Sequence, residues 1–106
     1  MASRATAIQY VKDFINELQQ NETLHLRKVY LYGSYVNDKA DEYSDIDVSL
    51  VADEFQGVEH VDVPLFVKEL KNFYKIQPKT FFPEVVNNGN PFWQHIRETG
   101  IEIPLA

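Results

Sequence analysis

Hydrophobic and polar positions recur along the chain with periods that change from segment to segment. From residue 4 to residue 20 the apolar positions return every three or four residues, the spacing of one helix face (Ala5, Ile8, Val11, Phe14, Ile15 and Leu18). Ser3 stands where the N-cap of that helix is expected. A β-branched and aromatic run at 29–32 predicts a short strand that ends at Gly33. Residues 35–42 are more polar, and we expect a short helix followed by a loop.

The middle of the chain holds the clearest strand. Residues 45–51 alternate strictly between polar and apolar side chains, which predicts a strand with one covered face. After a loop at 53–61, Pro64 suits the first turn of a helix, and we expect that helix to cover 65–75 with Asp62 as its cap.

The last third of the chain predicts a strand, a helix and a further short strand. Residues 76–82 form the strand, and Pro78 restricts it to a sheet edge or an irregular stretch because proline donates no hydrogen bond. Asn90 caps the last helix, which runs to about residue 99. Residues 101–103 predict a short final strand.

This order of elements predicts one small α/β (α+β) domain over residues 1–106, with helices flanking a mixed sheet of three to four strands. A length of 106 residues leaves room for one domain. Cysteine is absent, which excludes disulfides, thiolate zinc sites and cysteine nucleophiles. No apolar run reaches the roughly 18 residues of a membrane span, and the N-terminus lacks a signal peptide's apolar stretch. We therefore expect a cytoplasmic protein without a membrane contact.

The charge of the chain is concentrated in one segment. Sixteen acids against ten bases give a net charge of −6, which argues against general nucleic-acid binding. Residues 38–62 contain one base, Lys39, and nine acids (Asp38, Asp41, Glu42, Asp45, Asp47, Asp53, Glu54, Glu59 and Asp62). The segment is either a solvated acidic loop or a site that gathers carboxylates around a divalent cation.

Asp45 and Asp47 are the first candidates for such a site. Separated by one residue in the predicted strand, they lie on one face with α-carbons roughly 6.6–6.8 Å apart. Two carboxylates that close repel each other unless a cation sits between them, and Mg²⁺ prefers hard oxygen ligands that it shares with phosphates. An isolated Asp-X-Asp is common, so the pair alone is weak support for a metal site.

Gly33 and Ser34 add a second candidate feature at the end of the preceding strand. Glycine lets the backbone approach a ligand closely, and the amides that follow begin a short helix whose N-terminus favours phosphate. Ser34 adds a hydroxyl donor. A turn with a cap explains Gly33 equally well when it is considered alone. Together with the two carboxylates, however, the pair describes a place for a metal–nucleoside triphosphate.

The spacing of these residues resembles a known signature. Gly33-Ser34, ten residues and then Asp45-Ile46-Asp47 is similar to the Gly-Ser-X10-Asp-X-Asp motif of the DNA polymerase β-like nucleotidyltransferase superfamily. The chain length and the stretch 43–48 resemble the minimal nucleotidyltransferases, small bacterial and archaeal proteins. These are often encoded beside a HEPN-domain protein as the antitoxin of a toxin–antitoxin pair. The resemblance implies the polymerase β-like nucleotidyltransferase fold.

The resemblance also implies roles for the motif residues. Gly33 and Ser34 would hold the β- and γ-phosphates, and Asp45 and Asp47 would coordinate Mg²⁺ and carry catalysis. A nucleoside monophosphate would move from ATP, or from another nucleoside triphosphate, to a hydroxyl, and pyrophosphate would leave. In the minimal enzymes the acceptor that the resemblance suggests is a tyrosine of the HEPN-domain toxin.

The sequence departs from the family pattern in two places. Active members carry a third carboxylate on a later strand, but residues 76–82 contain no acid and Lys79 stands near its place. Glu59, Asp62 and Glu84 lie nearby in sequence, none of them at the expected position. In the segment after Gly33-Ser34, many relatives have a basic residue and a glycine where this chain has Asn37-Asp38, and Lys39 is a candidate substitute.

Two main hypotheses therefore stand. The first is a Mg²⁺-dependent enzyme that modifies a partner protein. The second is a catalytically degenerate nucleotidyltransferase-like module that neutralises its partner by stoichiometric binding. A metal buffer without a nucleotide is a remote third. Self-association and a contribution of a second subunit to the site stay open. Of the tyrosines around the motif (Tyr30, Tyr32, Tyr35 and Tyr43), we expect most to belong to the core or to the wall of the site, and one to stack on a base. If Phe92 and Trp93 are not both buried, one of the two rings suits a protein interface.

Overall fold

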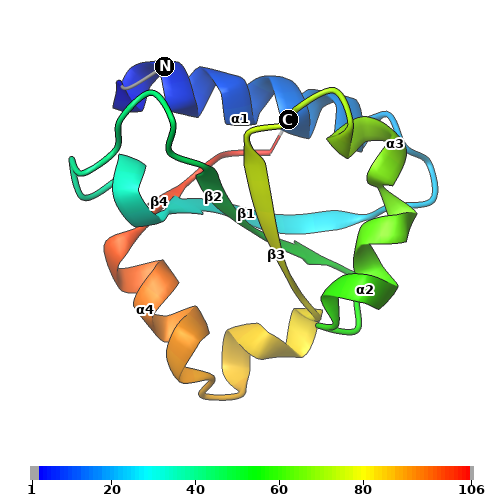
Figure 1. Ribbon diagram of the computed structural model, residues 1–106. Helices are drawn as coiled ribbons and strands as arrows, with labels where there is room; N and C mark the ends of the chain where they lie inside the picture. The colour runs from blue at the N-terminus through cyan, green and yellow to red at the C-terminus, as the bar shows by residue number, and fades with distance from the viewer. Residues whose placement is uncertain (1–2, 106) are drawn as a thin grey trace.

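A four-stranded mixed sheet forms the centre of the protein in the computed structural model, which describes residues 3–105 (Figure 1). The strands lie in the order β3-β2-β1-β4. Their bounds are Leu26–Tyr32 for β1, Ile46–Ala52 for β2, Ile76–Phe81 for β3 and Ile101–Glu102 for β4. β1 is antiparallel to β2 and β4, whereas β2 and β3 are parallel. The predicted fold class is confirmed, and the strand that contains Pro78 lies at a sheet edge.

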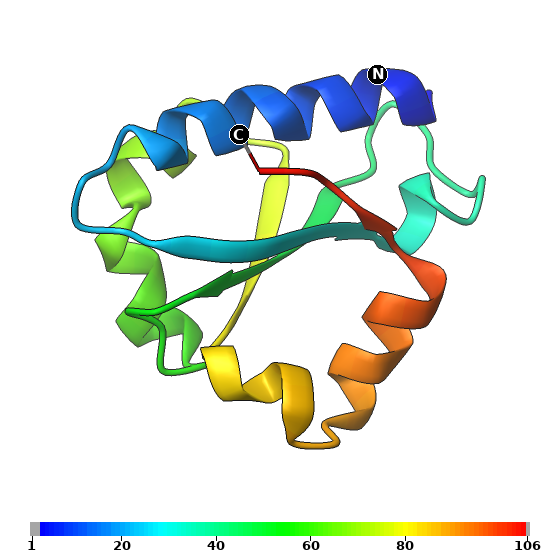
Figure 2. The ribbon, with the colours of Figure 1, turned by 180° about the vertical axis from the view of Figure 1, so that it is seen from behind.

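Helix α1 (Arg4–Gln19) covers one face of the sheet, as Figures 1 and 2 show from opposite sides. Its apolar face packs on side chains of β2 that alternate toward it, namely Ile46, Val48 and Leu50. The predicted cap is confirmed, because the Ser3 hydroxyl accepts a hydrogen bond from the Thr6 N–H. No helix in the described part of the chain is long and apolar enough to cross a membrane.

Helix α4 (Pro91–Thr99) and the 3₁₀ helix η3 (Pro83–Asn87) cover the opposite face. Trp93 is 1% exposed and packs edge-on against Tyr30 and Phe81, with ring centroids 5.4 and 5.5 Å away. Its neighbour Phe92 remains 42% exposed, so only one ring of the pair is buried. Asn90 caps α4 by accepting from the Trp93 N–H.

The predicted helix over 65–75 is correct only at 67–70 and is not one continuous helix. The chain instead forms α2 (Glu59–Asp62), the 3₁₀ turn η2 (Val63–Leu65) and α3 (Val67–Leu70). The break falls at Phe66, whose φ of −137° is not helical and whose side chain is fully buried against Phe14 and Phe55. Burial of this ring outweighs the local helical periodicity.

Asp62 does not cap that helix but closes the loop before it. The carboxylate is 0% exposed and accepts hydrogen bonds from the N–H groups of Gln56, Gly57 and Val58 at 2.8, 2.9 and 3.1 Å. The Thr80 hydroxyl on β3 donates a fourth bond at 2.7 Å. Asp62 therefore ties the 56–58 loop to the sheet edge, and its lone pairs are occupied by that task.

The predicted helix within 35–42 is also wrong, since η1 (Gly33–Tyr35) is a single 3₁₀ turn. The chain leaves helical geometry at Asp38, which has a φ of +58°. The Arg4 guanidinium donates to the Val36 carbonyl at 2.6 Å, so a side chain takes the place of a helical N–H. The phosphate site that we expected at the N-terminus of a helix is therefore reduced to the turn itself.

Candidate functional site

Gly33 and Asp47 are in direct contact at the start of the β1–β2 pair. Tyr32, the last residue of β1, is the register partner of Asp47 in β2. The chain turns immediately afterwards at Gly33, where φ is +81°. A Cβ at this position would lie 2.3 Å from Oδ2 of Asp47, so any side chain would displace the carboxylate. The structure thus brings the glycine and the second aspartate of the motif together.

Asp45 and Asp47 stand close enough to influence each other. Asp45 is exposed just before β2, and Asp47 is half-buried on the sheet face opposite α1. Desolvation raises the pKa of the Asp47 carboxyl above its usual range, and the negative charge of Asp45 raises it further. Both effects disfavour ionised Asp47 in the absence of a cation.

The raised pKa of Asp47 gives a stability prediction with a definite sign. The folded state binds the proton of the Asp47 carboxyl more tightly than the unfolded state does. The free energy of unfolding therefore falls as pH rises from the pKa of this carboxyl in the unfolded state to its pKa in the folded state. Asp47→Asn should therefore melt at a higher temperature than the wild type at pH 7. Thermal melting curves should show this difference shrinking as pH falls toward about 3, where both proteins carry a neutral group.

Asp53→Asn is the matched control, because Arg27 donates to that carboxylate and lowers its pKa. The ion pair stabilises the folded state at pH values above the pKa of Asp53 in the unfolded state, and this stabilisation is lost at low pH. The control should melt at or below the wild-type temperature at pH 7. An equal or lower melting temperature for Asp47→Asn at pH 7 would contradict the electrostatic description of the site.

Ser34 lies in the η1 turn beside Gly33 and is half-buried. The turn is held by backbone bonds, since the Val36 N–H donates to the Gly33 carbonyl and the Lys39 N–H to the Ser34 carbonyl, both at 3.0 Å. Lys39 thus supports the turn through its main chain, while its side chain is exposed. Tyr35 is a core residue, and its hydroxyl donates to the Asp41 carbonyl at 3.3 Å. The motif residues are therefore held by both strand register and loop packing.

Tyr32 is a site residue that the sequence did not single out from the other tyrosines. Its side chain shares the Asp47 face of the sheet and packs edge-on against Phe92 at 5.8 Å between centroids. Desolvation raises the pKa of its hydroxyl to about 12, with added effects from the charges of Asp47 and Glu59. The hydroxyl stays protonated at physiological pH and remains a hydrogen-bond donor. Its position two residues upstream of Ser34, at a strand end, is the one sequence signal for this role.

β3 supplies no carboxylate to this face. Its residues in register with Asp47 and Ser49 are Gln77 and Lys79. The Lys79 ammonium lies 5.9 Å from the ring centroids of both Phe81 and Phe92, which places its charge over aromatic rings. This face of β3 therefore lacks the acid that is also missing from residues 76–82 in the sequence.

The three acids considered as substitutes differ in where the structure places them. Asp62 is buried and fully engaged in the 56–58 loop. Glu84 lies in η3, just beyond the C-terminal end of β3. That end of β3 pairs with Val51 of β2, which is four residues further along the strand than Asp47. Glu59, at the start of α2, is the acid whose charge acts on the Tyr32 hydroxyl. Of the three, only Glu59 is electrostatically linked to the candidate site.

The Asp45–Asp47 pair fits a divalent ion that also binds phosphate. Within residues 3–105 no three acids or histidines are grouped so that they could enclose a metal by themselves. Mg²⁺ is commonly held by one or two carboxylates, with substrate phosphates and water completing its octahedron. A cation beside Asp47 would also offset the burial and repulsion that raise the pKa of this group.

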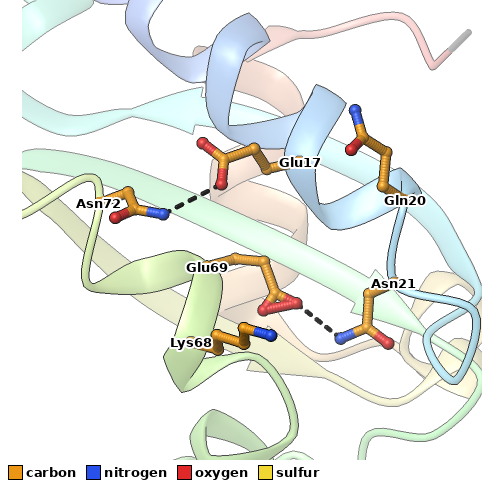
Figure 3. Close-up of a pocket in the computed structure, with 6 residues that line it drawn as sticks. All are labelled: Glu17, Gln20, Asn21, Lys68, Glu69 and Asn72. Carbon is orange, nitrogen blue, oxygen red and sulfur yellow. Dashed lines mark hydrogen bonds between the residues drawn. The ribbon is translucent and has the colours of Figure 1, made fainter.

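A separate polar hollow of about 400 Å³ lies between α1 and α3 (Figure 3). Two hydrogen bonds cross it, from Asn72 to Glu17 at 3.1 Å and from Asn21 to Glu69 at 2.8 Å. Both helices pack on the face of the sheet opposite to Asp47. This hollow is therefore distinct from the motif residues.

The fold is that of a nucleotidyltransferase domain. A protein from Sulfolobus solfataricus, described as a "putative nucleotidyltransferase", superposes with a TM-score of 0.56 over 93% of this chain and 80% of its own, at 16% identity. A family model for the nucleotidyltransferase domain matches residues 11–97, and the chain belongs to that family. No curated protein gives a significant match.

Proposed function

We propose that the protein transfers a nucleoside monophosphate from a nucleoside triphosphate, with ATP as the first candidate, to a hydroxyl of a partner protein in a Mg²⁺-dependent reaction. Membership in the nucleotidyltransferase family supports nucleotidyl transfer in general. The single observation that carries the proposal is the packing of Gly33 against Asp47, with Asp45 next to it. This contact joins the phosphate-binding turn and the carboxylate pair into one site.

Each motif residue has a task in this proposal. The Gly33–Ser34 turn would hold the β- and γ-phosphates through backbone N–H groups and the Ser34 hydroxyl. Tyr32, which stays protonated, would donate a hydrogen bond to a phosphate oxygen. Asp45 and Asp47 would hold Mg²⁺, which neutralises charge on the triphosphate when bound. The acceptor oxygen forms a bond to the α-phosphorus, the bond to the bridging oxygen breaks, pyrophosphate leaves, and a base or water takes the acceptor proton.

The partner proposal rests on the resemblance of the chain length and of residues 43–48 to minimal nucleotidyltransferases. On that basis the acceptor is a HEPN-type toxin, and the protein is its antitoxin. A second candidate is a catalytically silent module that neutralises the toxin by binding alone. The observation that favours this second function is the sheet face of β3, where Gln77 and Lys79 stand in place of an acid.

Replacing both carboxylates tests the enzymatic function. We expect Asp45→Asn/Asp47→Asn to lower transfer of label from α-phosphate-labelled ATP to the partner by at least about 100-fold, because the two carboxylates would hold the Mg²⁺ that stabilises charge at the reacting phosphate. Asp13→Asn, an exposed substitution on α1, should transfer at the wild-type rate. A folded double variant that neutralises the toxin as well as the wild type, with no transfer by either protein, would favour the binding module.

A further inference from the structure

A second hollow, of about 360 Å³, lies directly beside Asp45. Its lining consists of Glu42, Tyr43, Asp45, Tyr74 and Lys75. Tyr43 and Tyr74 are 83% and 84% exposed, whereas every other large hydrophobic side chain exposed in the described chain is exposed by 42% or less. Two tyrosine rings left this open, beside the candidate metal ligand, mark a surface that is suited to a partner.

The hollow is held in shape by hydrogen bonds that its backbone groups make with each other and with two side chains. The Lys75 ammonium donates to the carbonyls of Glu42 at 2.7 Å and Ser44 at 3.3 Å. The Tyr43 N–H donates to the Asp41 carboxylate at 2.8 Å, and the Ile46 N–H donates to the Lys75 carbonyl at 2.8 Å. The segment before β2 is thus fixed to the segment before β3. A ligand would find the surface already formed.

The sheet places this hollow and the Gly33 turn on opposite sides of β2. β1, which ends at Gly33, pairs with one edge of β2, and β3, which Tyr74 and Lys75 precede, pairs with the other. In-line displacement requires the attacking oxygen to approach the phosphorus opposite to the leaving group. If pyrophosphate leaves toward Gly33 and Ser34, the acceptor must approach from the side of the hollow. This step rests on the proposed function.

The charge of the hollow identifies the kind of acceptor. Glu42 contributes a carboxylate that the proposed metal site does not use, and Asp45 adds its charge when no Mg²⁺ is bound, while the ammonium of Lys75 is directed to backbone carbonyls. A guanidinium stacks on tyrosine faces and pairs with carboxylates through its planar donors. We propose that the hollow binds a basic segment of the acceptor protein, in which an arginine between Tyr43 and Tyr74 places a neighbouring hydroxyl at Asp45.

Chemical-shift mapping by NMR with a defined probe tests this proposal. The amide of the tripeptide Arg-Tyr-Arg should shift resonances of residues 42–45 and 74–75 saturably at millimolar concentration, and Glu-Tyr-Glu should not. Tyr43→Ala and Tyr74→Ala should each weaken binding about two- to fivefold, the effect of one exposed cation–π contact. Tyr43→Phe, which keeps the ring, should bind like the wild type. Glu42→Gln should weaken binding about two- to fivefold, and the exposed control Glu22→Gln should not.

Two results of the tripeptide titrations would overturn the docking proposal. One is a set of shifts of equal size for both tripeptides, or equally large shifts at the Glu17–Glu69 hollow between α1 and α3. The other is unchanged affinity in Tyr43→Ala and Tyr74→Ala. Titration with Mg²⁺ and ATP in the same samples separates this failure from that of the proposed function. If ATP shifts the resonances of Gly33 and Ser34 but the tripeptides show no specific response, the docking proposal fails and the proposed nucleotide site is retained. If ATP shifts the resonances of Tyr43 and Tyr74, the hollow binds the nucleoside instead.

Discussion

Gly33→Ala is expected to abolish measurable binding of Mg²⁺–ATP and to lower the free energy of unfolding by about 2–4 kcal/mol. Two costs add at this position. An alanine would have to adopt a φ of +81°, and its Cβ would meet Oδ2 of Asp47 at 2.3 Å. The carboxylate must move away, which separates the proposed phosphate-binding turn from the proposed metal ligand. Titration calorimetry and urea denaturation measure the two effects.

Gly89→Ala separates strain from contact. Gly89 has a similar φ of +76°, but a Cβ there would meet nothing within 4 Å. This control substitution should lower the free energy of unfolding by only about 1–2 kcal/mol, the penalty of a left-handed backbone at alanine. The variant should bind Mg²⁺–ATP as the wild type does. If Gly33→Ala and Gly89→Ala lose the same stability and both still bind nucleotide, the close approach of Gly33 to Asp47 is not needed for nucleotide binding.

Asp62→Ala is expected to destabilise the protein by about 3–5 kcal/mol, the largest effect of any single polar substitution proposed for this chain. It would leave three part-buried N–H groups of the 56–58 loop and the buried Thr80 hydroxyl without their acceptor. The loop should detach from β3, with faster amide exchange at residues 56–58. Urea denaturation and hydrogen exchange by NMR measure both consequences.

The matched control for Asp62 is Asp13→Ala on the exposed face of α1. Asp13 accepts one side-chain hydrogen bond from Gln9, and its loss should cost less than about 0.5 kcal/mol. The loss of stability in Asp62→Asn should lie between those of Asp62→Ala and Asp13→Ala, because the amide keeps the volume of the side chain but directs its NH₂ donor toward other donors. A loss below about 1 kcal/mol for Asp62→Ala would contradict the structural role of this carboxylate.

The parts of the fold that the sequence predicts well are those with strong local signals. Ser3 and Asn90 both act as caps where the cap pattern predicted them. Alternation over 45–51 locates β2 to within a residue, and Pro78 correctly indicates an edge strand. The contact between Gly33 and the Asp-X-Asp strand follows from the motif spacing together with the hairpin-like order of β1 and β2.

The parts that sequence reasoning missed depend on contacts between distant segments. Burial of Phe66 against Phe14 interrupts the helix predicted over 65–75. Arg4 reaches across 32 residues to the Val36 carbonyl and helps to limit the 35–42 segment to one turn. The electrostatic link from Glu59 to Tyr32 likewise appears only when α2 is placed in space. No local periodicity encodes such pairings.

The most direct measurement compares two isotopic labels of ATP. The protein is incubated with its partner and Mg²⁺, once with ATP labelled at the α-phosphate and once with ATP labelled at the γ-phosphate. Nucleotidyl transfer predicts that the α-label becomes covalently attached to the partner, that the γ-label is released as pyrophosphate, and that Gly33→Ala loses the signal while Gly89→Ala keeps it. Attachment of the γ-label, or attachment of neither label to a partner shown to bind the protein, would contradict nucleotidyl transfer by this site.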